Sequence, residues 1–226
     1  MNISRLFDLQ VIIVTWPVFL FSLSLHEFMH AWLADRLGDS TARYSGRLTI
    51  NPFAHYDPIG TTFGLLFRTF GWAKPVPVNP VLFRWPQRHM MITALGGPAM
   101  NFALAGVCLV AFKILVARSP LDPNETPGLI GLFLKMAGYG IVLNLTLAVF
   151  NLVPVFPLDG HHILRGFLSF HAALVYDRTK QFGILLLIPV VILGSPVISR
   201  VVVQLIKWSL SWPELLELSK ILHQVY

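Results

Sequence analysis

The chain has 226 residues, of which 55% are hydrophobic and only 12% are charged, and its mean hydropathy is +0.66. A soluble domain is usually about one quarter charged, so this composition excludes an ordinary soluble protein and indicates an integral membrane protein. The net charge of +6 would suggest a nucleic-acid partner in a soluble protein, but the basic residues cluster in particular loops, which is typical of membrane orientation. We expect one integral-membrane domain over residues 1–226, with membrane lipids and no nucleic acid as partners.

The first apolar run, residues 9–36, is long enough to cross a bilayer as a helix, and it contains the sequence His26-Glu27-Phe28-Met29-His30. Residues four apart share one face of a helix, so His26 and His30 can direct two imidazoles at one metal ion. Glu27 follows the first histidine and can reach a water molecule on that metal. Ionisable side chains are costly in hydrocarbon, and we therefore interpret this stretch as a functional site.

The longest non-spanning region, residues 40–88, follows the first span. Residues 47–50 alternate between polar and apolar side chains, which predicts a strand. Residues 74–80 contain three prolines and are expected to be extended, as an edge strand or a polyproline-like piece. Residues 59–70 are apolar but too short to cross, so a re-entrant or interfacial segment is expected. The region as a whole predicts a small membrane-associated β-hairpin or sheet between the first and second spans.

Further apolar runs complete a predicted membrane all-α fold with about four to six transmembrane helices. The run over residues 182–206 is interrupted at Gly194 and predicts either one kinked helix or a tight helical hairpin. The other expected elements are a second span at 89–117, a short loop at 118–128, a third span at 129–152, a half-polar helix at 161–176 and an amphipathic tail helix at 212–226.

The distribution of basic residues predicts the orientation of the spans. The loop after the first span holds six lysines and arginines and the loop after the third holds three, whereas the loop between the second and third holds only Arg118. The positive-inside rule therefore places the first and third of these loops in the cytoplasm. His26, His30 and Asp159 then lie toward the same, cytoplasmic side of the membrane.

A catalytic zinc usually takes three protein ligands, so the histidine pair needs a third. Asp159, at the broken end of the third span, is the best candidate, although an aspartate before a glycine at a helix start is also a common N-cap. His161 and His162 compete as ligands but are expected to face the cytoplasm or to support the ligands. Asn151 either donates to a developing oxyanion or the substrate backbone, or satisfies carbonyls at the end of its helix.

Three other residues receive structural interpretations. Gly97 and Asn101 are one helical turn apart in the second span, and small residues at that spacing favour close helix packing. His55, in the first loop, is interpreted as a structural hydrogen-bonding histidine.

At this point the chain resembles a known family. The sequence His26-Glu27-Phe28-Met29-His30 in a span, followed downstream by Asn-Leu-Val-Pro-Val-Phe-Pro-Leu-Asp-Gly over residues 151–160, is similar to the site-2 protease family of intramembrane zinc metalloproteases. Residues 46–60 and 97–101 also resemble family motifs, and the likeness covers about residues 22–166. Compared with larger members, the chain resembles a minimal form without a PDZ or CBS domain.

The resemblance implies that His26, His30 and Asp159 bind one Zn²⁺ per chain and that Glu27 is catalytic. It also implies cleavage within or near the transmembrane helix of a membrane-anchored, regulatory protein, in a prokaryotic inner membrane with the active site toward the cytoplasm. Zinc lowers the pKa of a bound water, and Glu27 would take the proton of that water as general base. The alternatives are a membrane metal-binding or transport protein and an inactive relative that binds client helices. A gating partner and the oligomeric state stay open.

Overall fold

The computed structural model describes residues 9–67, 71–118 and 128–225, and over these residues the chain forms helices and connecting turns without a strand. Four helices are long and apolar enough to cross a membrane, which agrees with the lower end of the predicted range. They are α1 (Leu9–Arg36), α5 (Pro86–Arg118), α6 (Leu129–Asn151) and, from Leu185 onward, α9 (Gly183–Ser209). The shorter elements are α2 (Thr41–Tyr44), α3 (Pro52–His55), α4 (Gly60–Phe67), η2 (Pro80–Leu82), α7 (Asp159–Phe167), α8 (Phe170–Asp177), η3 (Arg178–Phe182) and α10 (Trp212–Val225).

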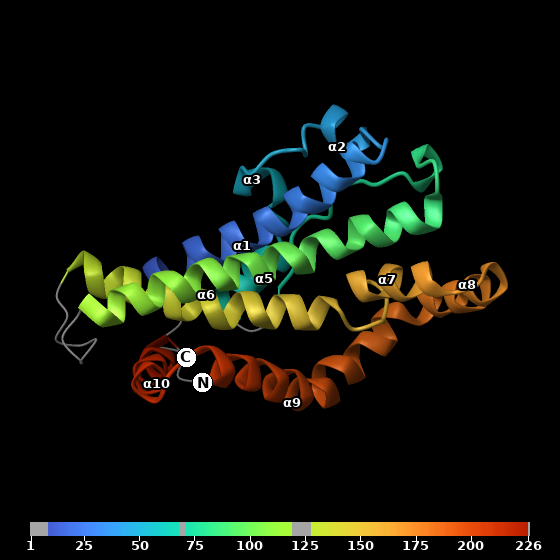
Figure 1. Cartoon of the computed structure of the whole chain (residues 1–226). Coiled ribbons are helices and arrows are strands. Elements are labelled where there is room, and N and C mark those ends of the chain that lie inside the picture. Colours follow the sequence, from blue (N-terminus) through green and yellow to red (C-terminus); the bar gives the residue numbers. More distant parts are fainter. Residues whose placement is uncertain (1–8, 68–70, 119–127, 226) are drawn as a thin grey trace.

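Helices α1, α5 and α6 lie side by side and form the centre of the molecule (Figure 1). Their shared core includes Phe19 from α1, Phe112 from α5 and Ile141 from α6, all buried. In a bilayer the lipid is as apolar as these side chains, so close packing rather than removal from water holds the helices together, and small residues permit it. At Gly140 of α6, for example, an added Cβ would lie 2.6 Å from Cys108 Sγ of α5.

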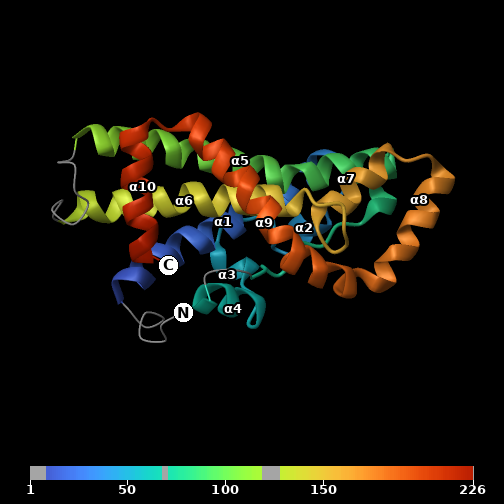
Figure 2. The same cartoon turned by 90° about the horizontal axis from the view of Figure 1, so that it is seen from below.

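Helix α9 is a single helix that runs through Pro189 and Pro196, so the first of the two alternatives predicted for residues 182–206 is the observed one. Its contacts with α6 place Val202 and Ile206 in the core. Helix α10 crosses α5 and α6 (Figure 2) and buries Leu218 and Ile221. The last two helices thus cover one side of the central three.

The prediction of a β-hairpin after the first span is wrong for the residues that the structure describes. After α2, the amide of Arg47 donates to the Ala42 carbonyl and so completes the helix end. The carbonyl of Thr49 accepts a hydrogen bond from Nε2 of His55 at 2.8 Å. The Arg47 amide and the Thr49 carbonyl therefore bond to groups in adjacent turns and not to a second strand. The predicted structural hydrogen bond of His55 is present.

The proline-rich segment at residues 74–79 has no regular secondary structure, and we call it the strap. Pro75 and Pro77 have no N–H, so the strap cannot offer the regular row of donors that a strand ladder requires. It is held by side chains instead. Arg47 donates to the Lys74 carbonyl at 2.5 Å, and the amide of Asn79 donates to Asp39 at 2.6 Å.

Two other predicted elements differ from the structure in extent. The half-polar helix expected at 161–176 is two helices, α7 and α8, and the Ser169 hydroxyl caps the second. The apolar segment expected at 59–70 forms α4, and residues 68–70 lie outside the described part. The loop predicted at 118–128 lies almost wholly outside it as well.

Candidate metal centre

The structure brings His26, His30 and Asp159 together from two helices. His26 and His30 lie one turn apart on α1, and Asp159 is the first residue of α7. The Nε2 atoms of the two histidines are 3.0 Å apart. Asp159 Oδ2 lies 3.2 Å from His26 Nε2, and its Oδ1 lies 3.3 Å from His30 Nε2. The three side chains are only 8%, 9% and 18% exposed, so they form a compact and largely dry cluster.

This cluster fits a single tetrahedral ion. With metal–ligand bonds of about 2.0–2.1 Å, the ligand atoms of a tetrahedral zinc site are separated by about 3.3–3.4 Å. The two nitrogens are 3.0 Å apart, and each lies 3.2 or 3.3 Å from a different oxygen of Asp159, so the three observed separations are close to this spacing. Two imidazoles and a carboxylate are also a donor set that zinc takes in catalytic sites, where a fourth position remains for water or substrate.

The second nitrogen of each histidine is already engaged. His30 Nδ1 lies 2.7 Å from the carbonyl of Thr93, and His26 Nδ1 lies 2.5 Å from Oδ1 of Asn101, both on α5. A carbonyl oxygen accepts but cannot donate, so each Nδ1 carries the proton and each Nε2 presents a lone pair. Two lone pairs and a carboxylate therefore converge in a buried space, which is electrostatically unfavourable unless a cation balances them.

Asp159 does not cap the helix that it begins. Leu158 is the N-cap of α7 and makes no side-chain cap, while the Asp159 carboxylate faces the two histidines. Its two oxygens face the Nε2 atoms of the two imidazoles, where an ionised carboxylate could complete the ligand set of a metal.

Two glycines permit the close approach of the helices that carry the site. A Cβ at Gly97 of α5 would lie 2.5 Å from His26 Nε2 and would also overlap His30. A Cβ at Gly160 would overlap the backbone carbonyl of Leu152 at the end of α6. The predicted close packing at Gly97 is thus packing against the imidazole rings of His26 and His30.

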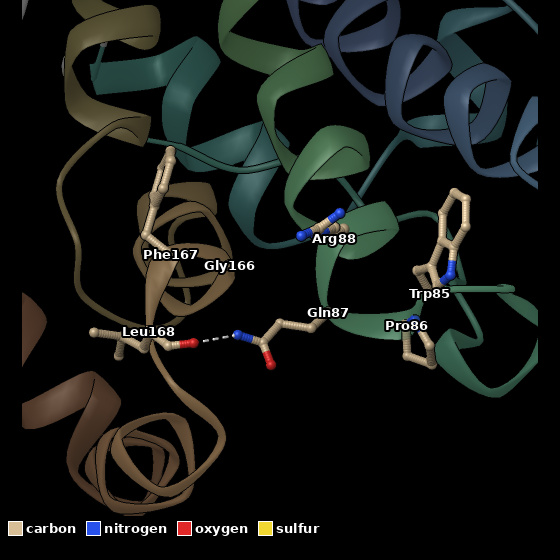
Figure 3. Close-up of a pocket in the computed structure, with 7 residues that line it drawn as sticks. All are labelled: Trp85, Pro86, Gln87, Arg88, Gly166, Phe167 and Leu168. Atoms are coloured by element: carbon tan, nitrogen blue, oxygen red, sulfur yellow. Dashed lines mark hydrogen bonds between the residues drawn. The ribbon is translucent and has the colours of Figure 1, made fainter.

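The start of α5 also holds the end of α7 in place (Figure 3). The side-chain amide of Gln87 donates to the carbonyls of Arg165 and Leu168, at 2.8 and 2.7 Å. These bonds span a shallow pocket that Trp85 also lines. They fix α7, and with it Asp159, relative to the helix that contacts both histidines.

Glu27 lies beside the cluster, half-buried, and its carboxylate contacts the strap. Oε2 of Glu27 accepts a hydrogen bond of 2.9 Å from the amide of Val76. Pro75 and Pro77 flank Val76, so this amide is the single backbone donor of the tripeptide. The side chain of Val76 is buried in a small cluster with Ala31 of α1. The strap therefore lies against α1 at Glu27.

The two histidines that follow Asp159 lie away from the cluster. His161 is fully buried, stacks on Tyr176 with the ring centroids 4.4 Å apart, and lies 3.5 Å from Asp177. Burial lowers the pKa of His161, and burial together with His161 lowers that of His162 to about 4. Neither belongs to the group of ligand atoms that could share one ion in the described residues.

Asn151 bonds within its own helix. Its side-chain nitrogen donates to the Leu147 carbonyl at 2.9 Å, as expected from its helix-ending interpretation. Its alternative role toward an oxyanion stays a prediction. The sequence interpretation missed Asn101, which was assigned to helix packing but bonds His26. The signal was present, because an amide in the middle of an apolar span is itself costly.

Comparison with known proteins decides the family. Over 179 residues the chain is 35% identical to the “Putative zinc metalloprotease YwhC” of Bacillus subtilis, a match that covers 78% of this chain and 80% of that protein. The chain belongs to peptidase family M50. The model of this family, the site-2 protease family, matches residues 125–194, which include Asp159. The M50 assignment makes zinc the metal of this chain and metalloprotease its class.

Two further relatives match the chain at lower identity. The chain is 31% identical over 202 residues to the “Putative zinc metalloprotease Rip2” of Mycolicibacterium smegmatis, covering 88% of this chain and 72% of that protein. A Rip2 of Mycobacterium tuberculosis is 30% identical over 183 residues, with 79% of this chain and 65% of that protein covered. No solved structure matches the chain.

Proposed function

We propose that this chain is an intramembrane zinc metalloendopeptidase that hydrolyses a peptide bond within or near the transmembrane helix of a membrane-anchored regulatory protein. The observation that carries the proposal is the convergence of His26, His30 and Asp159 next to Glu27, at a depth that belongs to the membrane. His26 lies ten residues, or roughly 15 Å, before the C-terminal end of α1, so it lies inside this candidate span and not at its edge.

In this proposal His26, His30 and Asp159 hold the zinc ion, one per chain. When bound, zinc lowers the pKa of water and polarises a carbonyl oxygen. Glu27 accepts the proton of the attacking water as general base, and then donates it to the nitrogen that leaves. The hydrogen bond from the Val76 amide restrains the rotation of the Glu27 carboxylate.

The strap is the proposed binding edge for the substrate. A peptide bond in a helix is hydrogen-bonded and shielded, so the substrate must unwind before water can attack it. Three of the four backbone amides in residues 74–79 bond within the chain, so the strap would hold an unwound segment mainly through its carbonyl groups and side chains and not as a complete added strand. Because Val76 of the strap contacts Glu27, a segment held there lies beside the general base.

We place the site toward the cytoplasmic side of a prokaryotic inner membrane. Helices α2, α7 and α8 lie toward the same end of the bundle in Figure 1, together with the C-terminal part of α1. These helices carry basic residues of the two predicted cytoplasmic loops, such as Arg43 in α2 and Arg165 in α7, and the positive-inside rule favours that orientation.

The test compares the wild type with Glu27→Gln, expressed at equal levels in the same bacterial membrane. Newly formed protein N-termini are identified by mass spectrometry, and bound zinc is measured in both purified proteins. We expect N-termini within or beside transmembrane segments in the wild type alone, with zinc retained in both. Equal sets of N-termini would refute the proposed activity, and cleavage confined to soluble proteins would refute the intramembrane assignment.

A further inference from the structure

A row of buried polar side chains leads away from the metal centre into the apolar core, and the proposed reaction does not use it. The row consists of Asn101 on α5, Asn144 on α6 and Ser22 on α1, which are 0%, 1% and 3% exposed. An amide removed from water is costly unless its hydrogen bonds are made, and lipid offers no replacement. All three side chains are bonded to one another in a chain.

The direction of these bonds is fixed at the far end. The side-chain nitrogen of Asn144 donates to the Gly140 carbonyl at 2.9 Å, and a peptide carbonyl can only accept. The same nitrogen lies 3.0 Å from the Ser22 hydroxyl. The Oδ1 atom of Asn144 must therefore face Asn101, whose nitrogen donates to it at 2.9 Å. This leaves Oδ1 of Asn101 facing His26.

The result is a defined tautomer of His26. Oδ1 of Asn101 can accept a proton from Nδ1 of His26, so the proton is held there and the lone pair of Nε2 points at Asp159 and His30. The two ligand histidines differ in this respect. His30 is held by the backbone carbonyl of Thr93, which cannot rotate, whereas the amide that holds His26 could turn over by itself.

We propose that Asn144, acting through Asn101, is a positioning residue that fixes the tautomer and orientation of His26 for zinc. The inference rests on the proposed function, because it concerns the same metal centre. If Asn144 could not orient Asn101, the amide of Asn101 could present its nitrogen to His26. His26 would then carry its proton on Nε2, and that atom could not ligate the metal. Outer partners of ligand histidines typically contribute 10- to 100-fold to metal affinity.

The experiment measures zinc affinity by chelator competition, with the full chain in detergent micelles. Asn101→Leu removes the acceptor and is expected to weaken zinc binding about 10- to 100-fold. Asn144→Leu leaves Asn101 in place but frees its amide, and a loss of about 10-fold is expected. Asn101→Asp keeps an acceptor for His26 Nδ1 but loses the donor to Asn144, and it should bind zinc more tightly than Asn101→Leu. Thr15→Val, equally buried on α1 and bonded only to the Val11 carbonyl, is the matched control and should leave affinity unchanged.

The outcomes separate the two proposals. A wild type without zinc refutes the metal centre itself, and with it the proposed function. A wild type with tight zinc, together with unchanged affinity in Asn144→Leu, overturns the positioning role alone. If Asn144→Leu does not fold, zinc affinity is compared between Asn101→Leu and Asn101→Asp. Equal affinity of these two variants overturns the inference, and tighter binding by Asn101→Asp supports it.

Discussion

Gly97 allows a sharp test of how tightly α5 closes over the metal centre. The perturbation is Gly97→Ala, which adds one methyl group 2.5 Å from His26 Nε2 and also in overlap with His30. Ordinary van der Waals contact begins at about 3.4 Å, so the rings must move by about 0.9 Å. Neither ring can move freely, because His26 is hydrogen-bonded to Asn101 and His30 is hydrogen-bonded to the Thr93 carbonyl.

The expected magnitude follows from the tolerance of a zinc site. Metal–ligand distances in good sites vary by about 0.2 Å, several times less than the required movement. Losing a single outer partner costs up to about 100-fold in metal affinity, and this substitution displaces two ligands at once. We therefore expect Gly97→Ala to weaken zinc binding by at least ~100-fold, or about 2.7 kcal/mol.

The assay is chelator competition for zinc, accompanied by thermal unfolding of the zinc-free protein. The matched control is Gly106→Ala on the same helix, where an added Cβ meets nothing within 4 Å. This change should leave zinc affinity intact and stabilise α5 by up to about 1 kcal/mol through helix propensity. Equal zinc affinity in the two variants would refute the described contact between Gly97 and the histidines.

Three further outcomes follow from the structure. Glu27→Gln should lower peptide-bond cleavage about 10²- to 10⁴-fold with bound zinc unchanged, and a smaller loss would contradict its role as general base. Val76→Pro removes the amide that bonds Glu27 and should lower the cleavage rate, whereas Val76→Ala keeps this amide and should be nearly as active as the wild type. Equal cleavage rates in the two variants would exclude a role for the Val76 amide in catalysis. Burial would raise the pKa of Asp177, but Lys180 and Arg165 outweigh it and lower the pKa below the unfolded value of about 3.9. Asp177→Asn should therefore reduce stability by ~1 kcal/mol at neutral pH, a difference in melting temperature that fades as the pH falls below about 4.

The spans and the proximity of His26 to His30 were accessible from the sequence because each rests on a short-range rule. The described part of α1 ends at Arg36, the predicted end of the first span. His26 and His30 meet because helical periodicity places them on one face. Asp159 required one more step, the orientation inferred from basic loops, which placed it on the same side as the histidines.

The strand prediction failed because alternation does not supply a partner. Residues 47–50 alternate, but the strap opposite them has prolines where a ladder needs donors, and Arg47 reaches it by its side chain instead. The role of Asn101 was missed for a different reason. Its spacing from Gly97 matches small-residue packing, and only the packed structure shows that the Asn101 side chain bonds both Asn144 and His26.

The central claim is most directly tested by counting zinc in the purified chain. Bound zinc per chain is measured in detergent for the wild type, for Asp159→Asn, and for Asp177→Asn as a matched control whose carboxylate pairs with Arg165 and Lys180 instead. We predict one zinc per chain in the wild type and in Asp177→Asn, and almost none in Asp159→Asn. Full zinc content in Asp159→Asn would contradict the three-ligand centre.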